Sequence, residues 1–570
     1  MRRVIVLPLA VLVIASAQLA LALPPPTIPK ESVSADAPAL ARAAIERLYS
    51  PDLKVQAAAL EVLAMEGPQA SAAVPFLVSM LPSFRPGWLE LVADAEQDRV
   101  GRGLLDALAG LGQPAVDALA EVLQDKRSAV REGAAAALAS MRIPVPAAPL
   151  LSALSDADPR VREQAAIALS DLPGDAVTKA LRTAATDPSL RVRTAAAGAL
   201  AQRHDPQAFG LLLPLLKGND QDSRLDALRA LGALGDRRAV PVISGLLRDK
   251  DWLVRGSAAW ELEVIGDKSA VPALIAALHG EGGETAASVA SALGGIGDRR
   301  AVPALLEALR SDYHSLASNA AEALGRLHDR RAFAPLLAAY RDPKCVFRKS
   351  ALTALGGTRD PRAYPILISA LHGKNTDLRA AAAEGLGALD DPRAFPLLFS
   401  ALRDPSEQVS LNAASGLTQL NAARTIPLLV AALGRETGKS ALDQIAEVLG
   451  RFGHSAVAPL TAALKDRKPE VRYGAALALG GTCDPTAVDA LLAARDDQNR
   501  GVRAAVLYAL FNINDPHAIP SLIQALGDQD AEVRSYAERL LTKRTGQPFG
   551  DDAAKWRDWW GKQTPAQATP

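Results

Sequence analysis

The sequence predicts an all-α protein whose helices form an α-α superhelix, that is, a solenoid of stacked helix pairs. The first observation behind this prediction is a strict period of 31 residues, since one position is alanine in ten of eleven successive occurrences from Ala208 to Ala518. The second is the spacing of the apolar residues between these markers, which follows a helix and not the alternation of a strand. Repeats of this length bury their apolar faces by stacking on their neighbours.

The composition fits many small helix contacts better than one large core. Of the 570 residues, 49% are hydrophobic and 4% are aromatic, so alanine, leucine and valine provide most of the apolar surface. Lysine plus arginine and aspartate plus glutamate both number 63, which gives a formal net charge of zero. Because nucleic-acid-binding proteins usually carry a basic excess, we expect no nucleic-acid partner.

The N-terminus has the pattern of a secretory signal peptide. The pair Arg2-Arg3 precedes the apolar run Val4–Ile14, and small-residue cleavage patterns end at Ala17 and Ala22. We therefore expect residues 1–22 to form a signal peptide and the mature protein to be exported to the periplasm or the extracellular space.

The alternative is an uncleaved anchor in the inner membrane, since Val4–Leu23 is just long enough to span a bilayer. Residues 23–37 are rich in proline and predict a stiff, extended linker. No later segment is long and apolar enough to suggest a membrane span in the mature chain. Cys345 and Cys483 lie several repeats apart, so we expect both to be free thiols.

A second series of markers covers more of the chain. One position is arginine in ten of fourteen repeats, and the position six residues earlier is aspartate in nine of the fourteen. Units of constant length therefore extend from residue 113 to residue 545. The repeats in which both residues are present contain the pairs Asp125 and Arg131, Asp156 and Arg162, Asp187 and Arg193, Asp249 and Arg255, Asp342 and Arg348, Asp466 and Arg472, Asp497 and Arg503, and Asp528 and Arg534.

Each unit is predicted to hold two helices. Apolar residues fall at i, i+3, i+4 and i+7 in the first helix, as from Val271 to Leu278, and at i, i+4, i+8 and i+11 in the second, as from Val254 to Ile265. Recurring Asp-Pro pairs place an N-cap acceptor before a proline at the first helical position. A further proline, such as Pro272, is expected just past the first turn, where it would bend the helix.

The repeat pattern GD-x-x-A-V-P-x-L-x-x-A-L, followed by D-x-x-x-x-V-R-x-x-A-A-x-A-L-G-x-x-G-D, resembles the HEAT-like repeat first associated with phycobiliprotein lyases. The resemblance covers most of the chain and implies a HEAT-repeat solenoid in which the aspartates and arginines form an internal ladder linking successive repeats. It identifies a fold far better than a function, because the family includes many pure scaffolds.

The two ends depart from the repeat. Residues 38–112 are predicted to be degenerate helical repeats that close the N-terminal end. Residues 546–570 contain Trp556, Trp559 and Trp560, half of the six tryptophans. These rings either cover the open apolar face of the last repeat or form a docking element for a partner, since clustered tryptophan is a frequent interface anchor.

No motif in the sequence indicates catalysis. None of the seven histidines stands in a metal-binding spacing or in the His-Glu pairs of the HEAT-repeat hydroxylases that act on deoxyhypusine. The segment Gly434–Ser440 ends like a phosphate-binding loop, but Leu433 occupies the position of the required first glycine. We predict no catalytic residue, no cofactor and no metal.

The arginine series is interrupted in two places. Ala286 and Ala317 form one gap, and Ser410 and Ala441 form the other. These positions either drifted without consequence, or their repeats flex or present a specialised concave surface to a ligand.

The function predicted from these observations is a non-catalytic protein-binding scaffold of the cell envelope, whose concave face is lined by the second helices. Trp252, Trp260, Tyr473 and Tyr508 lie on second helices and could anchor a protein or peptide partner. The alternatives are a lyase-like enzyme or enzyme subunit resembling bilin lyases, which the export signal disfavours, and a purely structural spacer.

Overall fold

The computed structural model describes residues 26–563, with the exception of 35, 82–94, 142, 281–282, 437, 514, 516–517, 546 and 548. Helices, turns and bends account for the described chain, and no strand occurs in it. The predicted all-α superhelical class is confirmed. The predicted signal peptide lies outside the described residues.

The chain divides into two compact units, Met1–Leu234 and Gly235–Pro570. Unit 1 contains two 3₁₀ turns, η1 (Lys30–Ser32) before its first helix and η2 (Gly67–Ala73) between α3 and α4. Its helices are α2 (Ala39–Arg47), α3 (Leu53–Glu66), α4 (Val74–Met80), α5 (Ala95–Leu111), α6 (Gln113–Val122), α7 (Ser128–Ala139), α8 (Ala147–Ala153), α9 (Pro159–Ala168), α10 (Asp175–Ala184), α11 (Leu190–Gln202), α12 (Ala208–Leu216) and α13 (Gln221–Leu234).

Unit 2 continues the alternation of first and second helices. Its helices are α14 (Ala239–Leu246), α15 (Trp252–Ile265), α16 (Val271–Gly280), α17 (Gly283–Ile296), α18 (Val302–Ala308), α19 (His314–Arg326), α20 (Phe333–Arg341), α21 (Arg348–Gly357), α22 (Ala363–Leu371), α23 (Thr376–Leu389), α24 (Phe395–Ala401), α25 (Glu407–Gln419), α26 (Ala422–Leu433), α27 (Lys439–Gly450), α28 (His454–Ala463), α29 (Pro469–Thr482), α30 (Val488–Ala493), α31 (Arg500–Ile513), α32 (Ala518–Ala525), α33 (Ala531–Thr545) and α34 (Ala553–Gln563).

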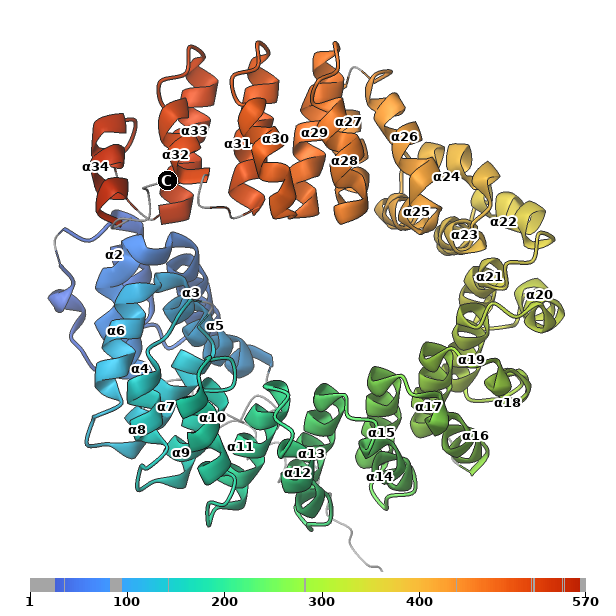
Figure 1. The fold of residues 1–570 in the computed structure, drawn as a ribbon, viewed down its shortest axis with the longest axis horizontal. Helices are drawn as coiled ribbons and strands as arrows, with labels where there is room; N and C mark the ends of the chain where they lie inside the picture. The colour runs from blue at the N-terminus through green and yellow to red at the C-terminus, as the bar shows by residue number, and fades with distance from the viewer. Residues whose placement is uncertain are drawn as a thin grey trace, which may run out of the picture. The chain divides into compact units, whose positions relative to one another are not determined.

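Within unit 2 the helices form two rows (Figure 1). The second helices, from α15 to α33 in odd numbers, succeed one another along the inner row, and most neighbours in this row pack directly together. From α14 to α25, where the two rows can be told apart in Figure 1, the first helices lie on the outer side. We call the side formed by the second helices of unit 2 the inner face.

In several repeats the aspartate that precedes the first helix caps a short 3₁₀ turn. Asp267 accepts a hydrogen bond from the amide of Ser269 (2.8 Å), and the turn η5 (Lys268–Ala270) then leads into α16. The N-cap prediction is therefore correct, but the α-helix begins one turn later than expected. Pro272 and Pro303 consequently stand in the first turn of α16 and α18, where a missing amide leaves no helical hydrogen bond unmade.

Successive second helices approach each other closely through small residues. A Cβ atom at Gly294 of α17 would lie 2.6 Å from the Cα atom of Ala323 in α19, and one at Gly356 of α21 would collide with the carbonyl of Gly385 in α23. Gly325 and Gly387 occupy the same position of their repeats and make similar contacts. We call these the glycine contacts.

The segment predicted as a linker is in part docked on the first helices. The amide of Thr27 donates to Ser79 Oγ (3.1 Å), the hydroxyl of Tyr49 donates to the carbonyl of Ile28, and Ala37 is buried. The described part of residues 23–37 thus packs against unit 1.

Two further observations concern the whole described chain. Of the helices that the structure describes, none combines the length and apolarity needed to cross a membrane. Cys345 and Cys483 are both free thiols, as expected.

Candidate functional site

The ladder joins neighbouring repeats through arginine–aspartate pairs of one geometry. In each of them the guanidinium donates two hydrogen bonds to the aspartate 25 residues later, and its Nη1 donates to two successive carbonyls of its own repeat. In the Arg162–Asp187 pair, both carboxylate contacts are 2.8 Å, and Nη1 lies 2.8 Å from the carbonyl oxygen of Asp156 and 3.2 Å from that of Ala157. Pairs of the same kind are Arg131–Asp156, Arg379–Asp404, Arg472–Asp497 and Arg503–Asp528.

At other steps the predicted ladder arginines donate hydrogen bonds to carbonyls of their own repeat. Arg193, Arg255 and Arg534 donate Nη1 to the carbonyls of Asp187, Asp249 and Asp528, and the positions 25 residues later hold Gly218, Gly280 and Trp559 instead of aspartate. Arg348 donates to the carbonyl of Tyr340 (2.9 Å). The positions 25 residues after these four arginines hold no aspartate, so no pair of the Arg162–Asp187 kind forms there. Asp125, Asp249, Asp342 and Asp466 each accept a hydrogen bond from the amide two residues later.

The ladder pairs are largely shielded from water and fully charged. The side chains of Arg162 and Asp187 retain 15% and 11% of their exposure. Hydrogen bonds from Arg162 lower the pKa of Asp187, and those from Arg379 lower the pKa of Asp404. Because each pair is bidentate, it fixes the orientation of one repeat on the next as well as their distance.

The tryptophan-rich tail forms the closing layer of unit 2. Trp556 of α34 is fully buried, and its indole nitrogen donates to the carbonyl of Gly550 (2.9 Å). Its ring meets those of Phe549 and Trp559 edge to face at 5.0 and 6.0 Å, and Trp560 packs beside them. Trp556 is therefore a core residue rather than an accessible anchor, which favours the covering interpretation of the tail.

Two predicted anchors are exposed at the start of the inner face. Trp252 and Trp260 of α15 are 56% and 60% exposed. They stand two helical turns apart with Gly256 between them, and Val264 continues the exposed apolar surface by one further turn. This surface, which we call the α15 surface, is separate from the second pair of predicted anchors.

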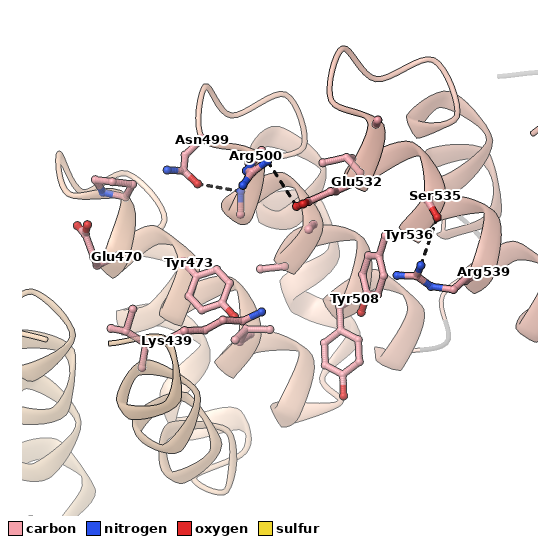
Figure 2. A pocket seen from close by; sticks show the side chains of 18 residues that line it. Lys439, Glu470, Tyr473, Asn499, Arg500, Tyr508, Glu532, Ser535, Tyr536 and Arg539 are labelled. Atoms are coloured by element: carbon pink, nitrogen blue, oxygen red, sulfur yellow. Dashed lines mark hydrogen bonds and ion pairs between the residues drawn. The ribbon is translucent and has the colours of Figure 1, made fainter. Parts of the chain in front are cut away.

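The second pair lies in a groove on the inner face near the end of unit 2 (Figure 2). Tyr473 of α29 and Tyr508 of α31 line it together with Tyr536 of α33, and its volume is 870 Å³. Lys439 of α27 extends beneath the ring of Tyr473, and Arg539 stands beside Tyr536 at the other end (Figure 2). We call this site the tyrosine groove.

Hydrogen bonds and burial hold two of the tyrosine rings in place. The hydroxyl of Tyr473 donates to Asp443 Oδ1 (2.8 Å), and burial followed by this hydrogen bond raises the pKa of Tyr473. Burial also raises the pKa of Tyr536, whose ring packs against the Trp556 cluster. Tyr508 is 39% exposed, so its ring is the most accessible to a ligand.

The charges around the groove are mixed. Arg500 forms an ion pair with Glu532 (3.4 Å) along the upper rim in Figure 2, and a further ion pair with Asp530 (3.3 Å). The guanidinium of Arg539 lies over the ring of Tyr536, 5.4 Å from its centre. An adjoining hollow of 460 Å³ shares Lys439 and the three tyrosines and continues toward Asp443. The arrangement provides aromatic faces, hydroxyl groups and both signs of charge for a peptide.

Tyr536 was not among the predicted anchors. The three tyrosines occupy three different positions of the 31-residue repeat, so periodicity gives no reason to group them. They meet because the three neighbouring helices α29, α31 and α33 place side chains from different repeat positions in the same groove. The signal available in the sequence was their density, since three of the seven tyrosines of the chain fall within the last three second helices.

No candidate for metal binding emerges from the part of the chain that the structure describes, where no group of three or more His, Cys, Asp or Glu side chains could hold an ion. The other two tryptophans predicted to bind a partner through the tail, Trp559 and Trp560, are half-buried.

Models of protein families match most of the chain. The model described as HEAT repeats matches residues 85–170, 147–223, 210–294, 243–319, 272–356, 302–376, 364–446 and 439–511. The model described as PBS lyase HEAT-like repeat matches residues 502–528. No curated protein matches the chain significantly.

Several solved structures are similar in their helical architecture. A crystal structure of importin beta is 14% identical with a TM-score of 0.42, covering 91% of this chain and 88% of its own. The structure of Kap121p is 13% identical with a TM-score of 0.48, covering 93% and 68%. The CpcE–CpcF complex of phycocyanin lyase from Nostoc sp. PCC7120 is 25% identical with a TM-score of 0.29, covering 44% and 90%. With TM-scores below 0.5, these similarities carry no inference about activity or partner.

Proposed function

Because this chain belongs to the HEAT-repeat proteins, we propose that it is a non-catalytic scaffold that binds a protein or peptide in the tyrosine groove. The observation that carries the proposal is the convergence of Tyr473, Tyr508 and Tyr536 in one groove of 870 Å³. Tyrosine offers a large apolar face and a polar tip at little cost in side-chain entropy, and it is enriched among the residues that dominate binding energy.

The surroundings of the groove also suit binding. The ladder pairs Arg472–Asp497 and Arg503–Asp528 join the repeats that carry the tyrosines, so the rings stand on helices of fixed spacing. A preorganised surface loses less conformational entropy when a partner binds. Tyr536 is supported from behind by the Trp556 cluster, which gives the closing layer an indirect part in binding.

The groove suits an extended segment that crosses the helices. It reaches from α27 to α33, which is three steps of helix packing. At about 8–10 Å per step the crossing spans roughly 27 Å, which an extended strand covers with about eight residues at 3.3 Å each. We therefore expect a recognition sequence of about this length.

The test is capture of partners by the purified chain, followed by calorimetric measurement of binding to each purified candidate. We expect Tyr508→Ala/Tyr536→Ala to weaken binding by at least tenfold, about 1.4 kcal/mol or more. The matched control is Tyr313→Ala, which removes a tyrosine that is 58% exposed at the start of α19 and outside the groove. Equal affinity of the groove variant and the control would contradict the proposal.

The tail remains a second possible docking element through its half-buried rings. Trp559→Ala/Trp560→Ala tests it when Tyr508→Ala is measured beside it and helicity is checked by circular dichroism. Loss of binding in the tail variant with retention in Tyr508→Ala would move the site from the groove to α34.

The location of this scaffold in the cell envelope is a proposal from the N-terminal sequence, where Arg2-Arg3 and the apolar run Val4–Ile14 support export. Fractionation with N-terminal sequencing of the mature chain tests it. A chain that begins after Ala17 or Ala22 and is found in the periplasm or medium supports export, an intact N-terminus in the inner membrane supports the anchor, and an intact chain in the cytoplasm contradicts both.

A further inference from the structure

Three devices join successive repeats along unit 2. The first is the ladder pair, the second is the glycine contact, and the third is a left-handed turn after the second helix. Each of these fixes one repeat on the next, so their joint absence at one step would mark a place where the solenoid bends easily.

The left-handed turn follows every second helix from α13 to α23, and it recurs after α29. A residue with φ between 49° and 73° ends the second helix and is followed at once by the capping aspartate of the next repeat. These residues are Gly235, Gly266, Gly297, His328, Arg359, Asp390 and Cys483. At the corresponding place after α25, Leu420 is extended (φ −68°, ψ 156°), Asn421 has a φ of −51°, and Ala422 replaces the aspartate.

The ladder pair is also missing at this step. Ser410 stands where the arginine would be, and its hydroxyl donates to the carbonyl of Leu402 (2.7 Å). Arg435 stands where the receiving aspartate would be. A cation at this position could not receive an arginine even if Ser410 were replaced.

The glycine contact is lost as well. The position held by Gly387 in α23 is Thr418 in α25 and Leu449 in α27. Gly387 meets Gly416 on the preceding side of the step, and on the following side a Cβ atom at Gly450 would lie 3.0 Å from the Cα atom of Gly481. Between them, α25 and α27 are the least closely packed neighbouring second helices of unit 2.

The contacts that do cross the step are peripheral or belong to one side. Arg403 forms an ion pair with Glu436 in which the arginine is half-exposed. The amide of Asn421 donates to Asp390 Oδ1 (3.2 Å), which holds Asn421 to the preceding repeats. Helix α26 packs mainly on α27, α28 and α29, so it belongs with the following repeats.

We propose that unit 2 contains a hinge at Leu420–Asn421, about which the body α26–α34 turns relative to the body α14–α25. The tyrosine groove lies wholly on the body α26–α34, which we call the second body, and the α15 surface lies wholly on the body α14–α25, which we call the first body. Motion at the hinge therefore changes the distance between the tyrosine groove and the α15 surface without changing either surface. A partner that binds both surfaces would select one relative orientation of the two bodies.

The two native cysteines allow a direct test, because Cys345 lies before the hinge and Cys483 after it. Spin labels on both report the distribution of distances between the bodies. In the unmodified sequence we expect a broad distribution. The variant Ser410→Arg/Arg435→Asp supplies the missing ladder pair, and we expect it to narrow the distribution by about twofold, since a bidentate pair fixes distance and orientation.

Two controls separate the hinge from general effects. Ala441→Arg supplies an arginine opposite Asp466 within the second body, so it should leave the distribution broad. Ser269→Cys with Cys483→Ser places both labels in the first body, where we expect a narrow distribution in the otherwise unmodified chain. A Cys345–Cys483 distribution as narrow as this internal one would overturn the hinge, whether or not the Ser410→Arg/Arg435→Asp variant folds.

Discussion

The two gaps in the arginine series look alike in the sequence but lie in different surroundings. At Ala286 and Ala317 the second helices α17 and α19 are in close contact through Gly294 and Ala323, and both alanines are fully buried. At Ser410 and Ala441 the helices α25 and α27 lack such a contact. Direct backbone packing therefore replaces the ion pair at the first gap, whereas at the Ser410 step of the second gap no such packing replaces it.

This difference teaches that a lost ladder pair does not by itself indicate flexibility. An ion pair and a glycine contact are two different ways of joining neighbouring second helices. Some steps have only one of them, whereas α23 and α25 are joined by both Arg379–Asp404 and Gly387–Gly416, and α29 and α31 by both Arg472–Asp497 and the contact of Gly480 with Ala509. The step at Leu420 is unusual because both alternatives and the regular turn fail together.

The largest expected difference in stability between the two gaps comes from restoring arginine at each of them. Ala286→Arg places a charge at a buried position opposite Ser311, which has no carboxylate, and we expect it to lower the local stability of α17 by about 3–4 kcal/mol. Ala441→Arg meets Asp466 and should change stability by less than about 1 kcal/mol. Native-state hydrogen exchange of α17 and α27 measures both, and equal tolerance would contradict the distinction between the gaps.

Adding a methyl group to a glycine contact should have the next largest effect. Gly356→Ala would drive a Cβ atom into the carbonyl of Gly385, so we expect a loss of about 2–3 kcal/mol in spite of the higher helix propensity of alanine. Thr418→Ala is the matched substitution at the same repeat position of α25, and it should cost less than about 0.5 kcal/mol. Urea denaturation followed by circular dichroism compares the two, and similar losses would show that the contact at Gly356 is unimportant.

The ladder itself is tested by an isosteric substitution. Asp187→Asn removes the charge that faces Arg162 and should cost about 2 kcal/mol, because a mostly buried guanidinium loses its counter-ion. Asp342 occupies the same repeat position opposite Ala317, and it accepts a hydrogen bond from the amide of Lys344 (2.9 Å). Asp342→Asn should therefore cost less than about 0.5 kcal/mol. If the two variants unfold at the same urea concentration, the ladder does not stabilise its repeats.

The smallest effect is a dependence on acid. The pKa of Asp187 and that of Asp404 are lowered in the folded chain by hydrogen bonds from Arg162 and Arg379. Their stabilisation is fully present above the unfolded aspartate pKa of about 3.9 and is lost as the pH falls through the lower folded values. We expect Arg162→Gln to reduce the difference in unfolding free energy between pH 7 and pH 3, and an unchanged difference would contradict the assignment.

Much of the fold could be predicted because each repeat carries its own local signals. The capping aspartates and the apolar stripes specify two helices per unit, and the 31-residue period specifies the stacking. The glycine contacts were not predicted, although Gly294, Gly325 and Gly356 recur in register, because spacing alone does not show which helical face meets a neighbour. The later start of the first helices was missed since the 3₁₀ turn obeys the same capping chemistry.

The candidate site was predicted in part. Tyr473 and Tyr508 meet in one groove, but Tyr536 belongs to another repeat position and joins them through packing between helices. Trp556 proved to be buried because its partners come from Phe549 and α33, which lie outside the repeat pattern. Local periodicity shows which face of a helix a residue occupies. Whether residues from different repeat positions meet depends on how the helices are stacked.

Hydrogen exchange on the unmodified chain tests the central claim most directly, because all steps are compared in one sample. The amides of Thr418–Arg424 are matched with those of Gly387–Arg393, which occupy the same positions one repeat earlier. The account predicts exchange about tenfold faster or more at Thr418–Arg424, together with protection of α17 and α19 equal to that of the ladder-linked α29 and α31. Equal protection of the two matched segments, or rapid exchange at α17 and α19, would contradict it.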